Sequence, residues 1–364
     1  MFRLAKSSEL PAARRGAAKL WTARLLVALS VSALPFCAKP SHGATVPAHA
    51  NLVLMVWQEQ FDELESLANE FRKEKTGFYS GWPKLCLLYE RLDSLDRNVT
   101  DAVWQEYIAK IEKWQQAFPE SPTPRVVLGD TYVKWAWKAR GGGYAYTVTE
   151  DGWRLMRERL AKARTVLEDA EKLPVRDAEL YRVIMKVALG QGWTKEELDA
   201  AFQKGIALDP NYQGLYEAKA YFLLPRWYGE KGEWEAFVAQ AADARGGDDG
   251  DVLYMSVARS QAWTEKEEFF KNTSISYERM KRGFEASLRR NPTYFWDMNS
   301  YCYFACIAGD SETAKQLFDK IKDRWEGGVW SRQDFDRWKA WANQPVQEAP
   351  RSIPPQSDKA QPSG

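Results

Sequence analysis

The chain has 364 residues, of which 45% are hydrophobic and 28% are charged, with a formal net charge of +1. This length allows one large domain or two ordinary ones, with enough chain to bury a core. The two histidines, His42 and His49, precede the expected folded region, which excludes Ser-His-Asp and Cys-His catalysis and His-ligated zinc or iron in the body of the protein.

Residues 1–50 have the pattern of an export signal. A basic segment that contains Arg3, Arg14 and Arg24 precedes an apolar run over residues 25–38. Because this run is shorter than the roughly 20 residues that span a bilayer, we expect cleavage near residue 43 or 50 and no stable membrane anchor. The mature protein is therefore expected in the periplasm or outside the cell.

Cleavage also changes the charge of the protein. Residues 1–50 hold seven basic residues and one acidic residue, so their removal lowers the net charge from +1 to −5. A nucleic-acid-binding protein needs a basic balance or a concentrated basic stripe, and neither is present in the remaining sequence. Nucleic acid is not an expected partner.

From residue 51 to about residue 343, apolar residues recur with helical period. This spacing predicts one helix over 104–118 and another over 153–170. Thr194 with Glu197, and Ser331 with Asp334, have the spacing of helix capping boxes. Prolines fall between the periodic segments, at positions 83, 119, 174, 210, 225 and 292. The predicted fold class is all-α, with about a dozen antiparallel helices.

One segment of the helical region recurs along the chain. Residues 198–212 and 280–294, offset by 82 positions, share an aromatic residue, a small residue and a proline at equal spacing. Both copies resemble the second helix of a tetratricopeptide repeat, and residues 309–321, from Gly309 through Phe318, resemble its inter-helix turn and second helix. The 34-residue period of that repeat is not kept, so the resemblance implies a degenerate solenoid whose helix pairs stack and leave a concave side.

Two connections between helices combine arginine, aromatic residues and glycine, at residues 135–144 and 223–229. An arginine beside aromatic rings can stack while its guanidinium holds a carboxylate. These blocks predict a binding surface for an anionic group or a peptide terminus; alternatively, each arginine anchors a helix end and the rings only pack. The candidate binding residues are Trp137, Arg140, Tyr144, Arg226, Trp227 and Tyr228.

Other patterns have plainer interpretations. Cys302 and Cys306 share one helix face, where a soft metal is conceivable, but cysteine also packs as a small hydrophobe. The loop Gly247–Asp251 lacks the ligand spacing of a calcium site and is interpreted as a solvated linker. No phosphate loop, dinucleotide fingerprint or nucleophile elbow occurs, so we expect no metal, no cofactor and no catalytic residue of those classes.

The chain as a whole resembles an uncharacterised bacterial family, domain of unknown function 4034. The resemblance is carried by residues 61–67 with 81–89, by Trp137 with Arg140 and Gly141, by the block Leu224–Gly229, and by Ser276–Phe284. It implies a tetratricopeptide-like helical fold and no established activity.

These patterns divide the chain into an export segment (1–50), a helical-repeat domain (51–343) and a proline-rich tail (344–364), which we expect to be disordered. The predicted function is non-enzymatic binding of a peptide or protein segment on the concave face, or scaffolding, in the bacterial envelope. The alternative is a carbohydrate-active enzyme on a ring of helices, because the 17 tryptophans can stack on sugars and a pair of carboxylates needs no histidine. The sequence does not place such a pair.

Overall fold

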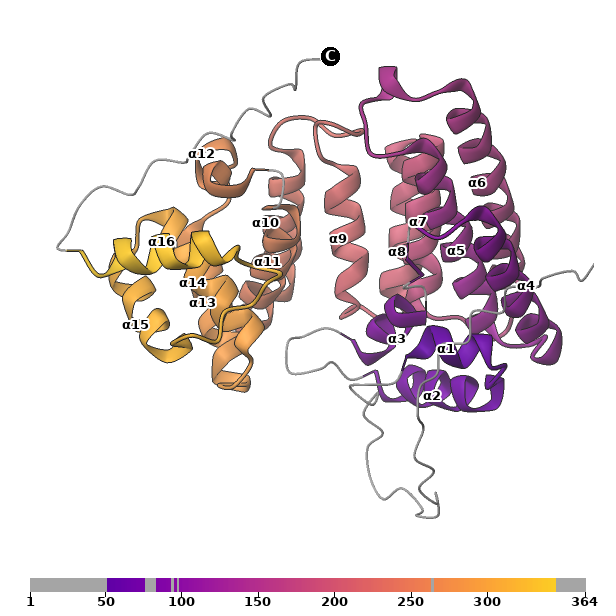
Figure 1. The fold of residues 1–364 in the computed structure, drawn as a ribbon, viewed down its shortest axis with the longest axis horizontal. Helices are drawn as coiled ribbons and strands as arrows, with labels where there is room; N and C mark the ends of the chain where they lie inside the picture. Colours follow the sequence, from indigo (N-terminus) through magenta and orange to yellow (C-terminus); the bar gives the residue numbers. More distant parts are fainter. Residues whose placement is uncertain (1–50, 76–82, 93–94, 97, 263–264, 345–364) are drawn as a thin grey trace, which may run out of the picture. The chain divides into compact units, whose positions relative to one another are not determined.

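The computed structural model describes residues 51–75, 83–92, 95, 96, 98–262 and 265–344. Within these residues the structure is helical, with sixteen α-helices and no β-strand (Figure 1). The all-α prediction is confirmed, and the helices are more numerous than the dozen expected. The predicted export signal and most of the predicted tail lie outside the described residues.

The bounds of the sixteen helices, in chain order, are as follows: α1 Leu52–Trp57, α2 Phe61–Glu74, α3 Lys84–Leu92, α4 Asp101–Ala117, α5 Pro122–Arg140, α6 Glu150–Glu171, α7 Ala178–Gln191, α8 Lys195–Leu208, α9 Gln213–Phe222, α10 Glu233–Arg245, α11 Gly247–Gln261, α12 Phe269–Asn272, α13 Tyr277–Arg290, α14 Phe295–Ala308, α15 Ser311–Ile321 and α16 Arg332–Ala342. Short 3₁₀ turns cover Ala145–Thr147 and Lys266–Glu268.

Helices that follow one another in the chain pack together. The neighbours from α4 to α8 are in contact, as are α10 with α11, α11 with α13, and each neighbouring pair from α13 to α16 (Figure 1). In addition, α7 contacts α9 and α9 contacts α11, so alternate helices also pack side by side. Sequential helix pairs with such second contacts are consistent with a helical array.

Helices α2 and α3 are tied to α7 by one carboxylate. Asp177 caps α7 by accepting the backbone N–H of Leu180 at 3.2 Å, and its other oxygen accepts from Arg72 Nε of α2 and from the Tyr89 hydroxyl of α3. Asp177 and Tyr89 are both buried. Because a buried carboxylate is costly without partners, these bonds fix α3 against α7.

The predicted apolar faces form the interfaces between helices. In α4, the residues Trp104, Ile111 and Trp114 are completely buried, and the predicted helix over 153–170 is α6. The small residues of the repeated segments are contact points: a Cβ on Gly205 in α8 would lie 2.8 Å from the Leu215 side chain of α9. The repeat therefore marks positions where two helices approach closely.

The predicted helix boundaries agree with the structure in most places. Thr194 and Glu197 form a reciprocal capping box at the start of α8. Ser331 accepts the backbone N–H of Asp334, and its hydroxyl donates to the Asp334 carboxylate, so the cap is present without the full box. The six prolines that were expected between periodic segments all lie outside the helices.

The interpretation of Gly247–Asp251 as a solvated linker is wrong, because these residues begin α11. Gly246 and Gly247 have positive φ and reverse the chain after α10, and Asp248 and Asp249 then occupy the first turn of α11. Acidic residues are favourable there because they face the positive end of the helix dipole. They also pair with α13: Arg289 with Asp248, and Arg290 with Asp249.

Cys86, Cys302 and Cys306 are free and buried. Cys302 of α14 is fully buried, and its Sγ lies 3.7 Å from the Ala314 carbonyl of α15. Cys302 is therefore a small packing residue between two helices.

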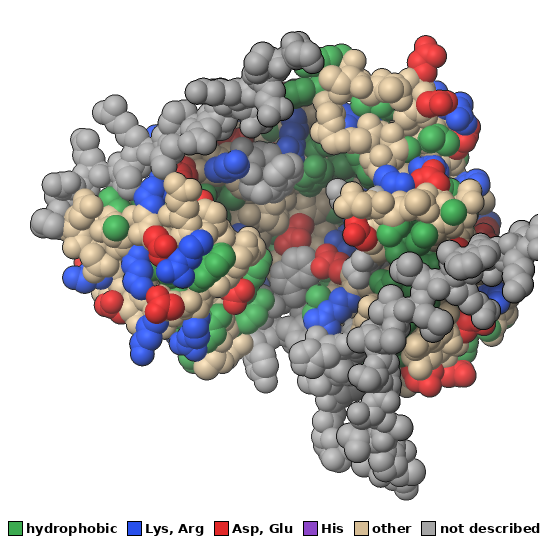
Figure 2. All heavy atoms as spheres, in the orientation of Figure 1, with side chains coloured by type: hydrophobic (Ala, Val, Ile, Leu, Met, Phe, Trp, Pro, Cys, Tyr) green, Lys and Arg blue, Asp and Glu red, His purple; other side chains and the backbone are tan. Residues whose placement is uncertain are grey.

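Charges of both signs are mixed on the surface. On the face shown in Figure 2, the acidic and basic side chains of the described residues are interspersed. No helix in this part of the chain combines the length and the apolar composition that crossing a membrane requires.

Candidate functional site

The two arginine-aromatic blocks of the sequence meet in the structure. The first block was expected in a connection, but Trp137 and Arg140 lie in the last turn of α5 and only residues 141–144 follow it; the second block follows the end of α9. The rings of Trp137 and Trp227 touch edge to face with centroids 5.6 Å apart. Trp153 of α6 and Tyr221 of α9 complete the cluster through Arg140 and Trp227 respectively. We call this cluster, with the tyrosines described below, the aromatic surface.

Local backbone geometry positions both blocks. Helix α5 ends where Gly141 adopts a φ of +76°, a conformation that glycine tolerates, and the Gly141 N–H bonds to the Trp137 carbonyl. After α9, a Cβ on Gly229 would lie 1.8 Å from the Leu223 carbonyl oxygen. Only glycine permits the tight turn that places Trp227 against Trp137.

Arg140 braces the connection from α5 to α6. Its guanidinium lies 5.5 Å from the Trp137 ring and 5.4 Å from the Trp153 ring, and Nη1 donates to the carbonyls of Gly141 and Gly143. Of the two interpretations that the sequence left open, these contacts favour an anchor for Arg140.

The braced connection exposes two tyrosines. Tyr144 and Tyr146 are 75% and 85% exposed, and their rings lie nearly parallel with centroids 5.7 Å apart. Thr147 holds the turn by donating from both its N–H and its hydroxyl to the Tyr144 carbonyl. Exposed tyrosines on a hydrogen-bonded turn are typical of protein-binding surfaces.

The second block makes different contacts. The exposed Arg226 lies over the Tyr221 ring at 5.1 Å. Tyr228 stacks on Phe222, its hydroxyl donates to the Leu189 carbonyl, and burial raises its pKa. Trp227 Nε1 is buried and has no hydrogen-bond partner among the described residues.

Sequence reasoning identified the blocks but missed Trp153, Tyr221 and Tyr146. Tyr146 has a local signal, because it lies two residues after Tyr144 in the same glycine-rich connection. The other two residues join the surface only through the packing of α6 and α9, for which the sequence carries no local signal.

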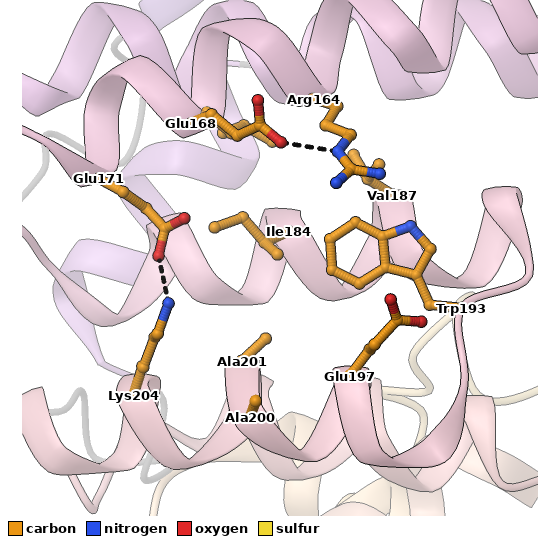
Figure 3. Close-up of a pocket in the computed structure, with 11 residues that line it drawn as sticks. Arg164, Glu168, Glu171, Ile184, Val187, Trp193, Glu197, Ala200, Ala201 and Lys204 are labelled. Carbon is orange, nitrogen blue, oxygen red and sulfur yellow. Dashed lines mark hydrogen bonds and ion pairs between the residues drawn. The ribbon is translucent and has the colours of Figure 1, made fainter.

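A separate groove lies between α6 and α8, over α7 (Figure 3). It has a volume of about 260 Å³ and an apolar floor that includes Ile184 and Val187. Its rim holds two ion pairs, Arg164 with Glu168 and Glu171 with Lys204, and Arg164 lies 4.9 Å from the Trp193 ring. Both cations of the rim are therefore already paired, while the Glu197 carboxylate, which also lines the groove, accepts only the backbone N–H of Thr194 among the described residues.

A polar centre lies where α3, α7 and α9 pack together, formed by Glu90, Arg182, Gln213 and Glu217. Arg182 donates to Glu90 at 3.3 Å, and Gln213 donates to Glu217 at 2.7 Å. Burial raises the pKa of Glu217 to about 7, against the opposing effects of the Gln213 bond and Arg182. The described residues include no group of three or more His, Cys, Asp or Glu side chains that could hold a metal ion.

No family model, curated protein or solved structure matches the chain. The resemblance to domain of unknown function 4034 therefore stays a prediction from the residues quoted for it.

Proposed function

We propose that the protein is an exported, non-enzymatic helical-repeat protein that binds a peptide or protein segment in the bacterial envelope. Its helix pairs correspond to degenerate tetratricopeptide-like repeats, and it is a member of the uncharacterised family that its sequence resembles. The fold is supported by the sequential helix pairs, by the close contact of Gly205 with α9, and by the hydrogen bond from the buried Ser287 to Asp297 of α14.

One observation supports binding above all: the connection after α5 exposes Tyr144 and Tyr146 to solvent, and it is held by Arg140, which itself contacts Trp137 and Trp153. Exposure of large aromatic rings is unfavourable in water, whereas burial of such rings contributes strongly to protein interfaces. Since the loop is already ordered by Arg140 and Thr147, a partner would lose little entropy in ordering it.

A displayed library of random peptides tests this proposal, with the mature protein as bait. We expect enriched peptides whose affinity falls at least tenfold in the double variant Tyr144→Ala, Tyr146→Ala, because interface aromatics contribute about 2 kcal/mol or more each. Trp296→Ala is the matched control, since Trp296 is a 37% exposed ring on α14.

Alanine variants of the two arginines distinguish a loss of binding from a loss of stability. Arg226→Ala should weaken peptide binding, whereas Arg140→Ala should lower the melting temperature because it removes the hydrogen bonds to Gly141 and Gly143. Equal peptide binding by the wild type and the double tyrosine variant would contradict the proposal.

A further inference from the structure

The polar centre has an excess of negative charge that its own cation does not balance. Arg182 is buried and donates from Nε to Glu179 at 2.7 Å and from Nη1 to Glu90 at 3.3 Å. Its stem crosses α9 at Gly214, where a Cβ would lie 2.6 Å from Arg182 Cδ. The arginine is thus fixed in place, with its charge directed to two carboxylates other than Glu217.

Glu217 has no cation of its own. The half-buried side chain accepts one hydrogen bond, from the Gln213 amide, and no described Lys or Arg forms an ion pair with it. Arg259, whose charge acts on Glu217 from α11, is paired with the fully buried Asp297. Burial and the nearby charge of Glu90 raise the pKa of Glu217 to about 7, although Gln213, Arg182 and Arg259 oppose them.

The hydrogen-bond inventory shows the same imbalance independently of charge. Glu179 is completely buried beside Arg182; its Oε2 accepts from Arg182 and Tyr212, but its Oε1 has no partner among the described residues. Glu217 is also short of donors, because its carboxylate accepts only from the Gln213 amide within the described part of the chain. A group that only donates hydrogen bonds and carries positive charge would supply what Glu217 and Glu90 lack.

We propose that Glu217 and Glu90 bind a primary ammonium group of a ligand, between α3 and α9. An ammonium offers three donors and no acceptor, so it can bond both carboxylates at once. The accessible part of Glu217 and the exposed side of Glu90 admit it from solvent, while Gln213 and Arg182 hold the two carboxylates in position. This site is separate from the aromatic surface and does not depend on the function proposed for it.

Three small probes test the site by calorimetry on the mature protein. Nα-acetyl-lysine amide carries a side-chain ammonium, norleucine amide carries an α-ammonium, and Nα-acetyl-norleucine amide carries neither. We expect binding of at least one of the first two probes and none of the third. The probe that binds identifies the source of the ammonium, either a lysine side chain or a chain terminus.

Glu217→Gln should weaken the bound probe at least tenfold, since a hydrogen bond to a charged group contributes about 1.5–3 kcal/mol. Glu158→Gln, on the exposed face of α6, should leave the affinity unchanged. If Glu217→Gln does not fold, Glu90→Gln makes the same test from α3.

The inference is overturned if neither charged probe binds, or if the variants at Glu217 and Glu90 keep the wild-type affinity. It is also overturned if the protein binds no amine but hydrolyses an oligosaccharide in a reaction that Glu217→Gln abolishes. That result would assign the two carboxylates to acid–base chemistry, the alternative raised by the sequence.

Discussion

Asp310 shows how much one side chain contributes at a turn between two helices. It caps α15 by accepting the Thr313 N–H at 3.0 Å, and it also accepts from the Tyr277 hydroxyl and from Lys281 Nζ of α13. Burial alone would raise its pKa, but Lys281, Thr313 and Tyr277 outweigh that effect and lower the pKa to about 2, from 3.8. The ionised form of Asp310 therefore stabilises the folded protein.

Asp310→Asn should lower the free energy of unfolding at pH 7 by about 2 kcal/mol. Because the folded pKa is depressed, this stabilisation is complete well above pH 3.8 and is lost as the pH falls through 3.8 toward 2. Urea unfolding at pH 7 and pH 3 should therefore show the difference between wild type and variant shrink by about half. Asp323→Asn, at a highly exposed position, is the control; a difference that is equal at both pH values would contradict this assignment.

At the scale of the elements, α11 and α13 come into near backbone contact. A Cβ on Gly283 of α13 would lie 2.3 Å from the Asp251 carbonyl oxygen and 2.6 Å from Met255 Cβ. Ion pairs from Asp251 to Arg279 and Arg282 bind the same two helices beside this contact. The glycine sets the distance between the helices, and the ion pairs fix their register.

Gly283→Ala should destabilise the protein by about 1–3 kcal/mol, because the added methyl group forces two packed helices apart. The matched control is Gly142→Ala, since a Cβ on Gly142 has no neighbour within 4 Å. Chemical unfolding of both variants measures the effect. Equal midpoints for the two variants would show that this close approach is not a constraint.

The sequence predicts elements well where the signal is local. The apolar period of α4 and the capping box at Thr194 depend on residues within a few positions of one another. The start of α11 was missed because Gly247 and Gly250 suggest a loop, and only pairing with α13 shows why acidic residues suit that turn.

The same distinction between local signals and long-range contacts applies to the candidate site. Trp137 and Trp227 could be selected from their neighbours in sequence, but their mutual contact joins residues ninety positions apart. Glu217 carried no sequence signal at all, because its environment is created by three helices that are not consecutive in the chain. Contacts of this kind can be identified only from the tertiary structure or from a set of related sequences.

At the scale of the whole molecule, the first testable property is export. We expect the protein expressed in a bacterial host to begin near residue 44 or 51 and to be released by osmotic shock, because the apolar run suits signal cleavage. N-terminal sequencing and intact mass measure this. Charged substitutions at Leu26 and Leu29 should retain the full-length chain in the cytoplasm; an intact Met1 on the released protein would contradict the expectation.

The buried cysteines matter if the protein is exported, because disulfides form in the periplasm and outside the cell. Burial raises the pKa of Cys86 and Cys306 well above the usual value, and the thiolate is the species that attacks a disulfide. Together with Cys302, these thiols form no cross-link within the described residues. Folding of this region would then need no disulfide formation. In an oxidising compartment the folded protein would not take part in thiol–disulfide exchange with other proteins.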